Sequence, residues 1–313
     1  MQNYKRNNPL YGTSRSLISL LMILVISFLA FNTVGPFLGI LISMPILDFD
    51  FSKTMEILAN PFDNPSAKIL MLITQGVASA FGFILIPWIY LKGKYNISLE
   101  PFFRPFHNNS LNLIGLTMMI VISFMFVNAF FIEWNLNIEL PGVLSGLEDL
   151  LKMFEENAKK LTEQLLQFDN MGQFILALVV IAIIPAIGEE LLFRGILQNL
   201  LINISRNIHI AIWVSAFLFS AIHLQFFGFI PRMLLGALFG YLYFWSGNLL
   251  YPMVAHFINN GFTLLMIYLY RSDVINFDVE QTESISITMV IIFGVITTGL
   301  LYYFKKINII ATQ

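Results

Sequence analysis

Cysteine is absent from the 313-residue chain. This excludes disulfides, thiolate nucleophiles and cysteine-ligated metal sites together. Charged residues are also scarce, because Asp, Glu, Lys and Arg make up 12% of the chain, whereas soluble domains contain about a quarter. The net charge of −2 provides no basic face, and no nucleic-acid-binding module is recognisable. The surface must therefore face something other than water.

Apolar residues take the place of the missing charges, at 57% of the chain and a mean hydropathy of +0.76. Apolar runs of about 20 residues, enough to cross a hydrocarbon core about 30 Å thick, recur along the sequence. We predict eight membrane spans, at residues 16–44, 69–91, 111–132, 171–200, 208–224, 230–246, 250–270 and 286–304. The first run is too long for a signal peptide and lacks a convincing cleavage site, so it is expected to be retained. The predicted fold is an all-α polytopic helical bundle, a single membrane domain over residues 1–313.

Orientation follows from the distribution of Lys and Arg, which are enriched in cytoplasmic loops. The basic residues that share one predicted side are Lys5, Arg6, Arg15, Lys92, Lys94, Arg104, Arg206, Lys305 and Lys306. The opposite loops carry most of the acids, including Asp48, Asp50, Asp273, Asp278, Glu280 and Glu283. We therefore expect both termini and residues 92–110 to be cytoplasmic and residues 133–170 to be outside. A short basic N-terminus without an organelle signal favours a bacterial cytoplasmic membrane.

The loop at 139–170 has a helical pattern of its own. Its apolar residues recur at spacings of four and three, at Leu147, Leu151, Phe154, Ala158, Leu161 and Leu165. Ser145 and Glu148 have the spacing of a capping box. The predicted i,i+4 ion pairs are Glu148–Lys152, Glu155–Lys159 and Glu156–Lys160. This extramembrane amphipathic helix is either a surface helix on the bilayer or the spans, or a lid or partner-docking helix beside a membrane active site.

Ionisable groups inside membrane spans are costly, and each is a functional-site hypothesis. The fourth, fifth and seventh spans contain a polar set spaced by whole helical turns: Glu189, Glu190, Arg194, His223, His256 and Asn260. Glu190 and Arg194 are four residues apart and can form an ion pair, whereas Glu189 is rotated by about 100° and stays free to take a proton from water. His256 and Asn260 also share a helical face, so both can donate hydrogen bonds to one oxyanion.

Each of these signals also has a structural interpretation. A membrane Glu–Arg pair is more often a clamp than a catalyst, and a lone histidine at the end of a span is usually interfacial. We assign His209 and the loop residue His107 to that interfacial class. Gly236 and Gly240 form a G-x-x-x-G motif that predicts close helix packing. The functional interpretation gains its weight from three spans that each contribute one polar turn.

The pattern Glu189-Glu190-x-x-x-Arg194, Phe219-x-x-x-His223 and His256-x-x-x-Asn260 resembles the three-motif signature of the CPBP intramembrane proteases. That family includes the CAAX prenyl endopeptidases and bacteriocin-processing enzymes, also described as lysostaphin-resistance-like or self-immunity proteins. The resemblance covers residues 171–270, with every motif position filled. It implies an all-helical endopeptidase with its active site within the bilayer and a peptide or protein substrate at the membrane.

Carried over by motif position, the resemblance implies that Glu189 activates the attacking water and His223 helps to hold it. His256 and Asn260 would stabilise the oxyanion, and Glu190 and Arg194 would support the site. Members of the family are also described as metalloproteases, which would make Glu189, His223 and His256 ligands of a divalent metal such as zinc. We favour the metal-free alternative, because neither histidine belongs to an H-x-x-x-H turn.

Three points stay open at this stage. On ideal helices, His223 lies near the outer end of its span, on the order of 10 Å from the level of Glu189 and His256. Prenylated CAAX peptides, bacteriocin leaders and membrane-protein segments all fit as substrates. A membrane immunity or binding protein with an unused site is the main alternative function. A secondary transporter is a weaker one, because no internal repeat is present.

Overall fold

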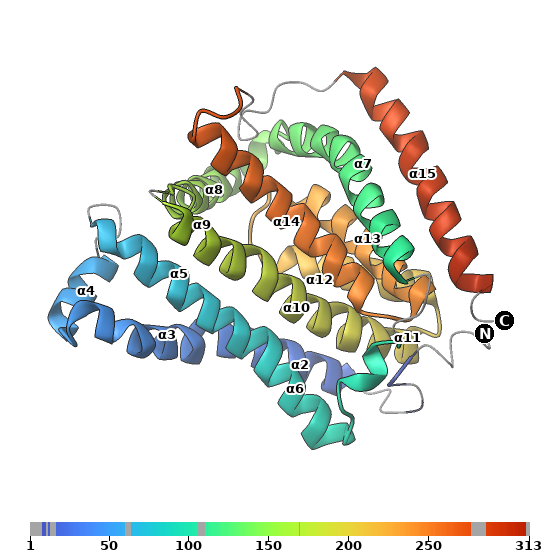
Figure 1. Ribbon diagram of the computed structural model, residues 1–313, viewed down its shortest axis with the longest axis horizontal. Helices are drawn as coiled ribbons and strands as arrows, with labels where there is room; N and C mark the ends of the chain where they lie inside the picture. Colours follow the sequence, from blue (N-terminus) through green and yellow to red (C-terminus); the bar gives the residue numbers. More distant parts are fainter. Residues whose placement is uncertain are drawn as a thin grey trace.

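The computed structural model describes residues 8–10, 12, 17–59, 64–105, 110–168, 170–276 and 286–310. All the regular elements of these residues are helices, arranged as a bundle (Figure 1). The polytopic all-α prediction is confirmed, and the protein is an integral membrane protein. Lys5, Arg6, Arg15, His107, Asp278, Glu280 and Glu283, used above, lie outside the described residues.

Several of the long helices are composite, because π-helical or 3-10 turns connect α-helical stretches. The first is built from α2 (Leu17–Leu29), η1 (Ala30–Val34), α3 (Gly35–Ser43) and η2 (Met44–Leu47). The second is built from α5 (Pro65–Ser79), η3 (Ala80–Leu85), α6 (Ile86–Tyr90) and η4 (Leu91–Tyr95). The fourth predicted span is built from α9 (Met171–Ala177), η7 (Leu178–Ile183), α10 (Ile184–Glu190), η8 (Leu191–Gln198) and α11 (Asn199–Ser205).

The remaining long helices are uninterrupted. They are α7 (Ser110–Leu136), α8 (Ser145–Leu165), α12 (Ile208–Ala221), α13 (Phe229–Ser246), α14 (Leu250–Arg271) and α15 (Ile287–Ile310). Short elements are α4 (Phe51–Ala59), which the sequence analysis missed, η5 (Glu100–Phe102) and η6 (Gly142–Leu144). In Figure 1, α10, α12, α13 and α14 occupy the middle of the bundle, and α15 packs on α7 at its edge.

A helix is present at each of the eight predicted spans, but in the described part of the chain only six are long and apolar enough to cross a membrane. The exceptions are α12 and α13. With 14 residues, α12 is about 21 Å long, which is shorter than a hydrocarbon core of about 30 Å. The two helices form a hairpin whose outer ends lie next to α11 and α14. The chain crosses the membrane an even number of times in either case, six times without the hairpin and eight times with it.

The elements predicted to be cytoplasmic meet at one end of the bundle. A shared apolar cluster there contains Leu10, Phe102 and Leu249, and the Leu249 N–H donates to the Phe102 carbonyl at 2.9 Å. The side-chain amide of Asn203, in α11, donates to the carbonyl of Leu10 at 2.7 Å. In Figure 1, α8 lies at the opposite end from α11. The grouping agrees with the predicted topology, and which end faces the cytoplasm stays a prediction.

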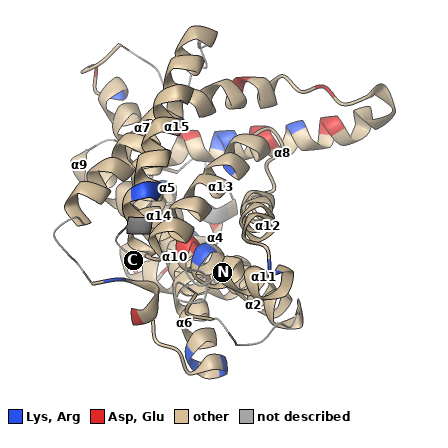
Figure 2. Ribbon diagram, turned by 90° about the vertical axis from the view of Figure 1, so that its right-hand side faces the viewer, with Lys and Arg blue, Asp and Glu red and all other residues tan. Residues whose placement is uncertain are grey.

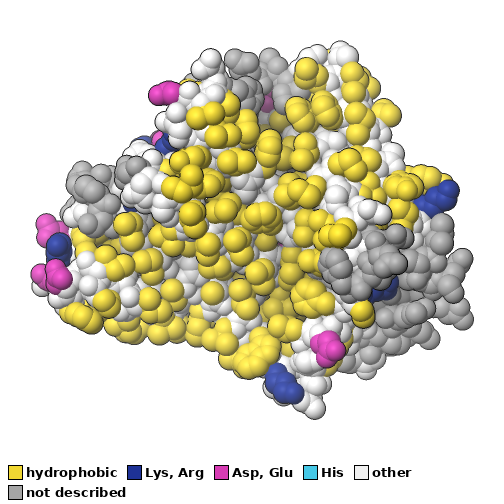
Figure 3. Space-filling view, in the orientation of Figure 1, with side chains coloured by type: hydrophobic (Ala, Val, Ile, Leu, Met, Phe, Trp, Pro, Cys, Tyr) yellow, Lys and Arg dark blue, Asp and Glu magenta, His cyan; other side chains and the backbone are white. Residues whose placement is uncertain are grey.

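The outer surface is apolar where a bilayer would touch it. Apolar side chains cover most of the face seen in Figure 3, and the charged side chains lie at its edges. Elsewhere, charges gather on α8 and near the helix ends (Figure 2). Apolar side chains of α2, such as Ile18 at 68% exposure, are left uncovered by the described part of the chain. Lipid is the environment that satisfies this surface.

The amphipathic helix at 139–170 is confirmed as α8, but its predicted cap and part of its ion pairing are wrong. The helix begins after a 3-10 turn, so its N-cap residue is Leu144 and no side chain caps it. Glu148 instead accepts from the N–H of Leu140 at 3.0 Å and pairs with Lys152 at 2.6 Å. The Glu155–Lys159 and Glu156–Lys160 pairs do not form in the described helix. Lys159 pairs with Glu163 at 3.8 Å, and Glu155 turns towards the centre of the bundle.

Candidate active site

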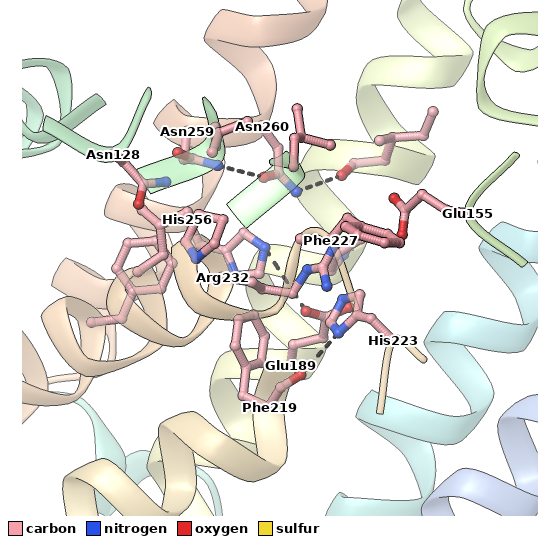
Figure 4. Close-up of a pocket in the computed structure, with 18 of the residues that line it drawn as sticks. Asn128, Glu155, Glu189, Phe219, His223, Phe227, Arg232, His256, Asn259 and Asn260 are labelled. Carbon is pink, nitrogen blue, oxygen red and sulfur yellow. Dashed lines mark hydrogen bonds and ion pairs between the residues drawn. The ribbon is translucent and has the colours of Figure 1, made fainter. Parts of the chain in front are cut away.

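A cavity of about 470 Å³ lies among α5, α7, α8, α10, α12, α13 and α14. Four of the six predicted site residues line it, namely Glu189, His223, His256 and Asn260 (Figure 4). The other two, Glu190 and Arg194, are fully buried behind it. The structure therefore brings all six together and separates those that a ligand can reach from those that it cannot.

Glu190 is the buried carboxylate that connects two helices. Its Oε1 accepts from Arg194 Nη1 at 2.8 Å, one turn away on the same helix, as the spacing predicts. The same oxygen accepts from Nδ1 of His256 in α14, also at 2.8 Å. A carboxylate that holds one imidazole nitrogen fixes the ring orientation and directs the other nitrogen. Glu190 therefore positions His256 as well as balancing Arg194.

Arg194 ties the same helix to α13. Its Nη2 donates to the carbonyl of Gly236 at 2.8 Å, and its guanidinium lies 4.6 Å from the centroid of the Phe219 ring, a cation–π distance. The predicted close packing at the G-x-x-x-G motif is confirmed. A Cβ on Gly236 would come within 3.1 Å of Ala216, and one on Gly240 within 2.8 Å of Gln198 Oε1. Both nitrogens at the tip of Arg194 are thus satisfied inside the protein.

Glu189 faces the cavity and has a less confined environment than its neighbour. Its side chain is 12% exposed, against 0% for Glu190. Nε2 of His256 lies 3.9 Å from Glu189 Oε2, which is too long for a direct hydrogen bond. Space for a bound water or a reacting group is therefore available beside Glu189.

His223 lies in the turn that follows α12, and its hydrogen bond determines its tautomer. Nδ1 lies 2.8 Å from the carbonyl of Phe219, four residues earlier. A carbonyl can only accept, so Nδ1 carries the hydrogen and Nε2 is left as the acceptor. A neutral His223 can therefore accept a hydrogen bond from a water in the cavity.

Asn260 is held by a backbone carbonyl that Pro185 in α10 leaves without its usual helical donor. Proline has no N–H to donate to the carbonyl of Ile181, four residues before it. The Nδ2 of Asn260 donates to that carbonyl at 3.0 Å, and its Oδ1 accepts from the amide of Asn259 at 3.1 Å. One hydrogen of the Asn260 amide stays available, because an amide nitrogen carries two.

The short α12 removes the mismatch in height that the sequence suggested for His223. The helix ends at Ala221, and the following turn includes Leu224 in a left-handed conformation with φ of 54°. The chain therefore turns back within the bundle, where the end of α12 meets α10 and α14. His223 reaches the level of Glu189 because its helix does not run a full span.

Residues 171–262 match the family profile described as type II CAAX prenyl endopeptidase Rce1-like. The chain carries an Rce1-like region. It includes α9 to α13 and the part of α14 that contains His256 and Asn260. The six predicted site residues all fall within this region, which supports the resemblance drawn from the motifs.

A relative with a similar segment is the uncharacterized protein YpbD of Bacillus subtilis (strain 168). The two chains are 35% identical over 85 residues, which is 26% of this chain and 40% of YpbD. The chain thus matches less than half of the length of this curated relative. No solved structure matches the chain.

The Rce1-like region was also tested as a metal site. In the described part of the chain, no group of three His, Asp or Glu side chains could hold a metal ion. Nδ1 of His256 is engaged by Glu190 and Nδ1 of His223 by a carbonyl, which leaves Nε2 of each ring as the nitrogen that faces a ligand. Glu189, His223 and His256 line the same cavity without converging on one point. As they lie in this structure, the described residues are not arranged as a metal site, and the reaction proposed for the cavity uses the side chains alone.

The sequence analysis missed two charged residues that line the cavity, Arg232 and Glu155. Arg232 is in the first turn of α13, inside the predicted span 230–246, where a lone charge was a usable signal. Glu155 is in α8, outside the Rce1-like region, and was assigned to a solvent-exposed ion pair. His209 is exposed as predicted, and its Nδ1 lies 2.7 Å from the hydroxyl of Tyr241.

Proposed function

We propose that the protein is an intramembrane endopeptidase that hydrolyses a peptide bond in a membrane-associated peptide or protein. The observation that carries this proposal is the division of the six motif residues. Glu189, His223, His256 and Asn260 line one cavity, while Glu190 and Arg194 hold the cavity wall from behind. A base, a water-holding acceptor and two donors around one space are the groups that peptide hydrolysis needs.

In the proposed reaction, a water lies between Glu189 and Nε2 of His223. Glu189 takes a proton from the water as its oxygen attacks the carbonyl carbon of the substrate. The proton then passes from Glu189 to the leaving nitrogen as the C–N bond breaks, which leaves a carboxylic acid and an amine. The acid then loses its proton to solvent. Base catalysis of this kind contributes about 10²–10⁴-fold to the rate.

The oxyanion of the tetrahedral intermediate would be stabilised by His256 and Asn260. Because Nδ1 of His256 donates to Glu190, a second donated hydrogen bond from Nε2 requires a protonated imidazole. Two carboxylates, Glu189 and Glu190, and two cations, Arg194 and His256, give a neutral set in that state. The free amide hydrogen of Asn260 is the second donor. One such donor is worth about 10²–10³-fold in rate.

The test compares Glu189→Gln with the matched exposed change Glu156→Gln in the full-length protein. Cleavage of membrane-partitioning fluorogenic peptides by the purified protein is the readout. Glu189→Gln is nearly isosteric and should fold normally while losing at least about 10²-fold in rate, since it removes the base. Glu156→Gln should cleave at the parent rate. Equal cleavage by both variants would overturn the proposal.

A further inference from the structure

Two opposite charges face each other at the outer end of the cavity. Arg232 comes from the first turn of α13, and Glu155 comes from the middle of α8 (Figure 4). Neither belongs to the three sequence motifs, and neither has a role in the proposed reaction. Both line the same cavity as Glu189.

Arg232 is anchored through one nitrogen and leaves the other without a partner. Its Nη2 donates to Gln225 Oε1 at 2.7 Å and lies over Gly228, where a Cβ would come within 3.0 Å of that nitrogen. Its Nη1 is buried and has no hydrogen-bond partner among the residues that the structure describes. A buried N–H group without an acceptor is unfavourable until a ligand supplies one. The guanidinium of Arg232 is thus fixed through Nη2, and Nη1 can donate a hydrogen bond to a ligand.

Glu155 is the carboxylate that faces Arg232, but no hydrogen bond joins the two described side chains. It accepts from the backbone N–H of Phe227, but its Oε2 is buried without a hydrogen-bond partner. Burial raises the pKa of Glu155, and the charge of Arg232 acts in the opposite direction. The two residues attract each other across the cavity without satisfying each other, so a better-placed anion can compete with Glu155 for Arg232.

We infer that Arg232 is a specificity-determining residue that binds the C-terminal carboxylate of the peptide substrate. In the absence of substrate, Glu155 of α8 faces Arg232 and competes for it. This inference rests on the proposed endopeptidase function. A guanidinium matches the planar geometry of a carboxylate and can donate two parallel hydrogen bonds to it.

A carboxylate with a single charge also suits the surroundings better than a phosphate does. Glu155 and Glu189 both interact electrostatically with Arg232, so two negative groups already flank the cation. A doubly charged phosphate would be repelled more strongly by these neighbours than a singly charged carboxylate. A peptide provides such a group at its C-terminus or on an Asp or Glu side chain, and the peptides compared below distinguish these two sources.

The test measures binding in full-length protein carrying Glu189→Gln, so that it does not depend on cleavage. The probes are dye-labelled, N-lipidated apolar pentapeptides that differ only at the C-terminus, which is a free acid or an amide. The acid should bind at least about tenfold more tightly, a difference of about 1.4 kcal/mol. Arg232→Gln should abolish this preference while retaining the amide affinity, whereas Arg206→Gln, at an exposed arginine, should leave it unchanged.

Two further variants test the competition and the placement. Glu155→Gln should increase affinity for the acid peptide a few-fold and leave the amide unaffected, while Glu156→Gln should change neither. Gly228→Ala should reduce the preference by displacing the guanidinium. A third peptide, amidated but ending in a glutamate, should bind like the amide.

Several results would overturn the inference. These are equal binding of acid and amide by the parent, an unchanged preference in Arg232→Gln, no effect of Glu155→Gln, or tight binding of the glutamate-containing amide. If Arg232→Gln binds neither peptide, Arg232→Lys, which keeps the charge, must retain part of the preference, and failure of both variants to distinguish the peptides also counts against it. An Arg232-dependent acid preference in a protein that never cleaves would contradict the proposed function alone.

Discussion

At the deep end of the site, behind the cavity wall, both terminal nitrogens of Arg194 are bonded, one to Glu190 and the other to the carbonyl of Gly236. At the outer end Arg232 has one terminal nitrogen bonded and one without a partner. Both arginines are in low-dielectric surroundings, where an unsatisfied charge is costly. The difference indicates that Arg194 stabilises the fold and that Arg232 is available to bind a ligand.

The carboxylates differ in how directly they meet a cation, although among the described residues each has one buried oxygen, Oε2, without a hydrogen-bond partner. Glu190 binds both Arg194 and His256, whereas Glu155 meets Arg232 only across the cavity. The deep pair lies wholly within the Rce1-like region, and the outer pair connects that region to α8. The chemistry is thus expected to follow the family pattern, while the outer end of the cavity also depends on α8, which lies outside the matched residues.

The largest expected effect separates the two arginines by stability. Arg194→Ala would leave Glu190 buried with a lost cation, which costs about 3–5 kcal/mol in comparable buried pairs. Arg232→Ala removes the bond to Gln225 and should cost about 1 kcal/mol. Denaturant titration of the purified variants in detergent, or their yield where Arg194→Ala does not accumulate, measures the contrast. Equal stability of both variants would show that the deep pair is not structural.

The ion pair at the deep end could be predicted from the sequence, because its two residues are close together in the chain. Glu190 and Arg194 are four residues apart, and any helix places them on one face. The bond between Glu190 and His256 could not be read in this way, because it depends on how α10 and α14 pack. The same holds for Asn260, whose partner is a carbonyl that Pro185 frees on another helix.

The outer end was missed for two different reasons. Arg232 was visible as a lone charge in a predicted span and was overlooked. Glu155 was not readable, because its partners Arg232 and Phe227 are far away in sequence, and a charge on an amphipathic helix is normally solvated. Its spacing to Lys159 suggested an ion pair that the structure does not form.

The fold was predicted in outline, with errors in length. Hydropathy located a helix at each predicted span, but it could not show that α12 ends before His223. The predicted span continued to residue 224, three residues beyond the end of α12, because Ile222 and Leu224 are apolar. The positive φ of Leu224 is a tertiary feature that hydropathy does not report.

The membrane topology determines from which side of the bilayer a substrate reaches the outer end of the cavity. We expect α8 outside and the loop before η5 in the cytoplasm. Because the chain has no cysteine, single cysteines at exposed positions can be labelled without background. In intact cells an impermeant maleimide should label Asn157→Cys, and should label Ser98→Cys only after permeabilisation. Labelling of both in intact cells would contradict the predicted orientation.

A smaller effect is expected from pH on the docking of α8. Burial raises the pKa of Glu155 above its ordinary 4.5, so the docked helix binds more protons than the free one. Docking should therefore weaken as pH rises through the window above 4.5. Hydrogen exchange of α8 amides, corrected for the intrinsic pH dependence of exchange, should show protection that falls as pH rises above the ordinary value of 4.5.

Glu148 provides the internal control for this experiment. Its bonds to Lys152 and the Leu140 N–H hold its pKa below the ordinary value, so its contribution is lost only as pH falls below that value. The two titrations are thus separated in pH. Glu155→Gln should remove the change above pH 5 and retain the change at acid pH, and a persistent slope above pH 5 would assign it to another group.

The smallest expected effect is that of chelation, which should leave cleavage unchanged. We expect a water activated by Glu189, because in the described part of the chain Glu189, His223 and His256 do not form a group of three that could hold a metal ion. An additional argument is that Asn260 occupies the position one turn after His256, where a second histidine would sit in an H-x-x-x-H zinc site. A neutral amide is a poor zinc ligand and a good oxyanion donor. Elemental analysis and activity after exhaustive chelation measure this. Stoichiometric zinc, with activity lost on its removal and restored by adding it back, would make Glu189, His223 and His256 ligands instead.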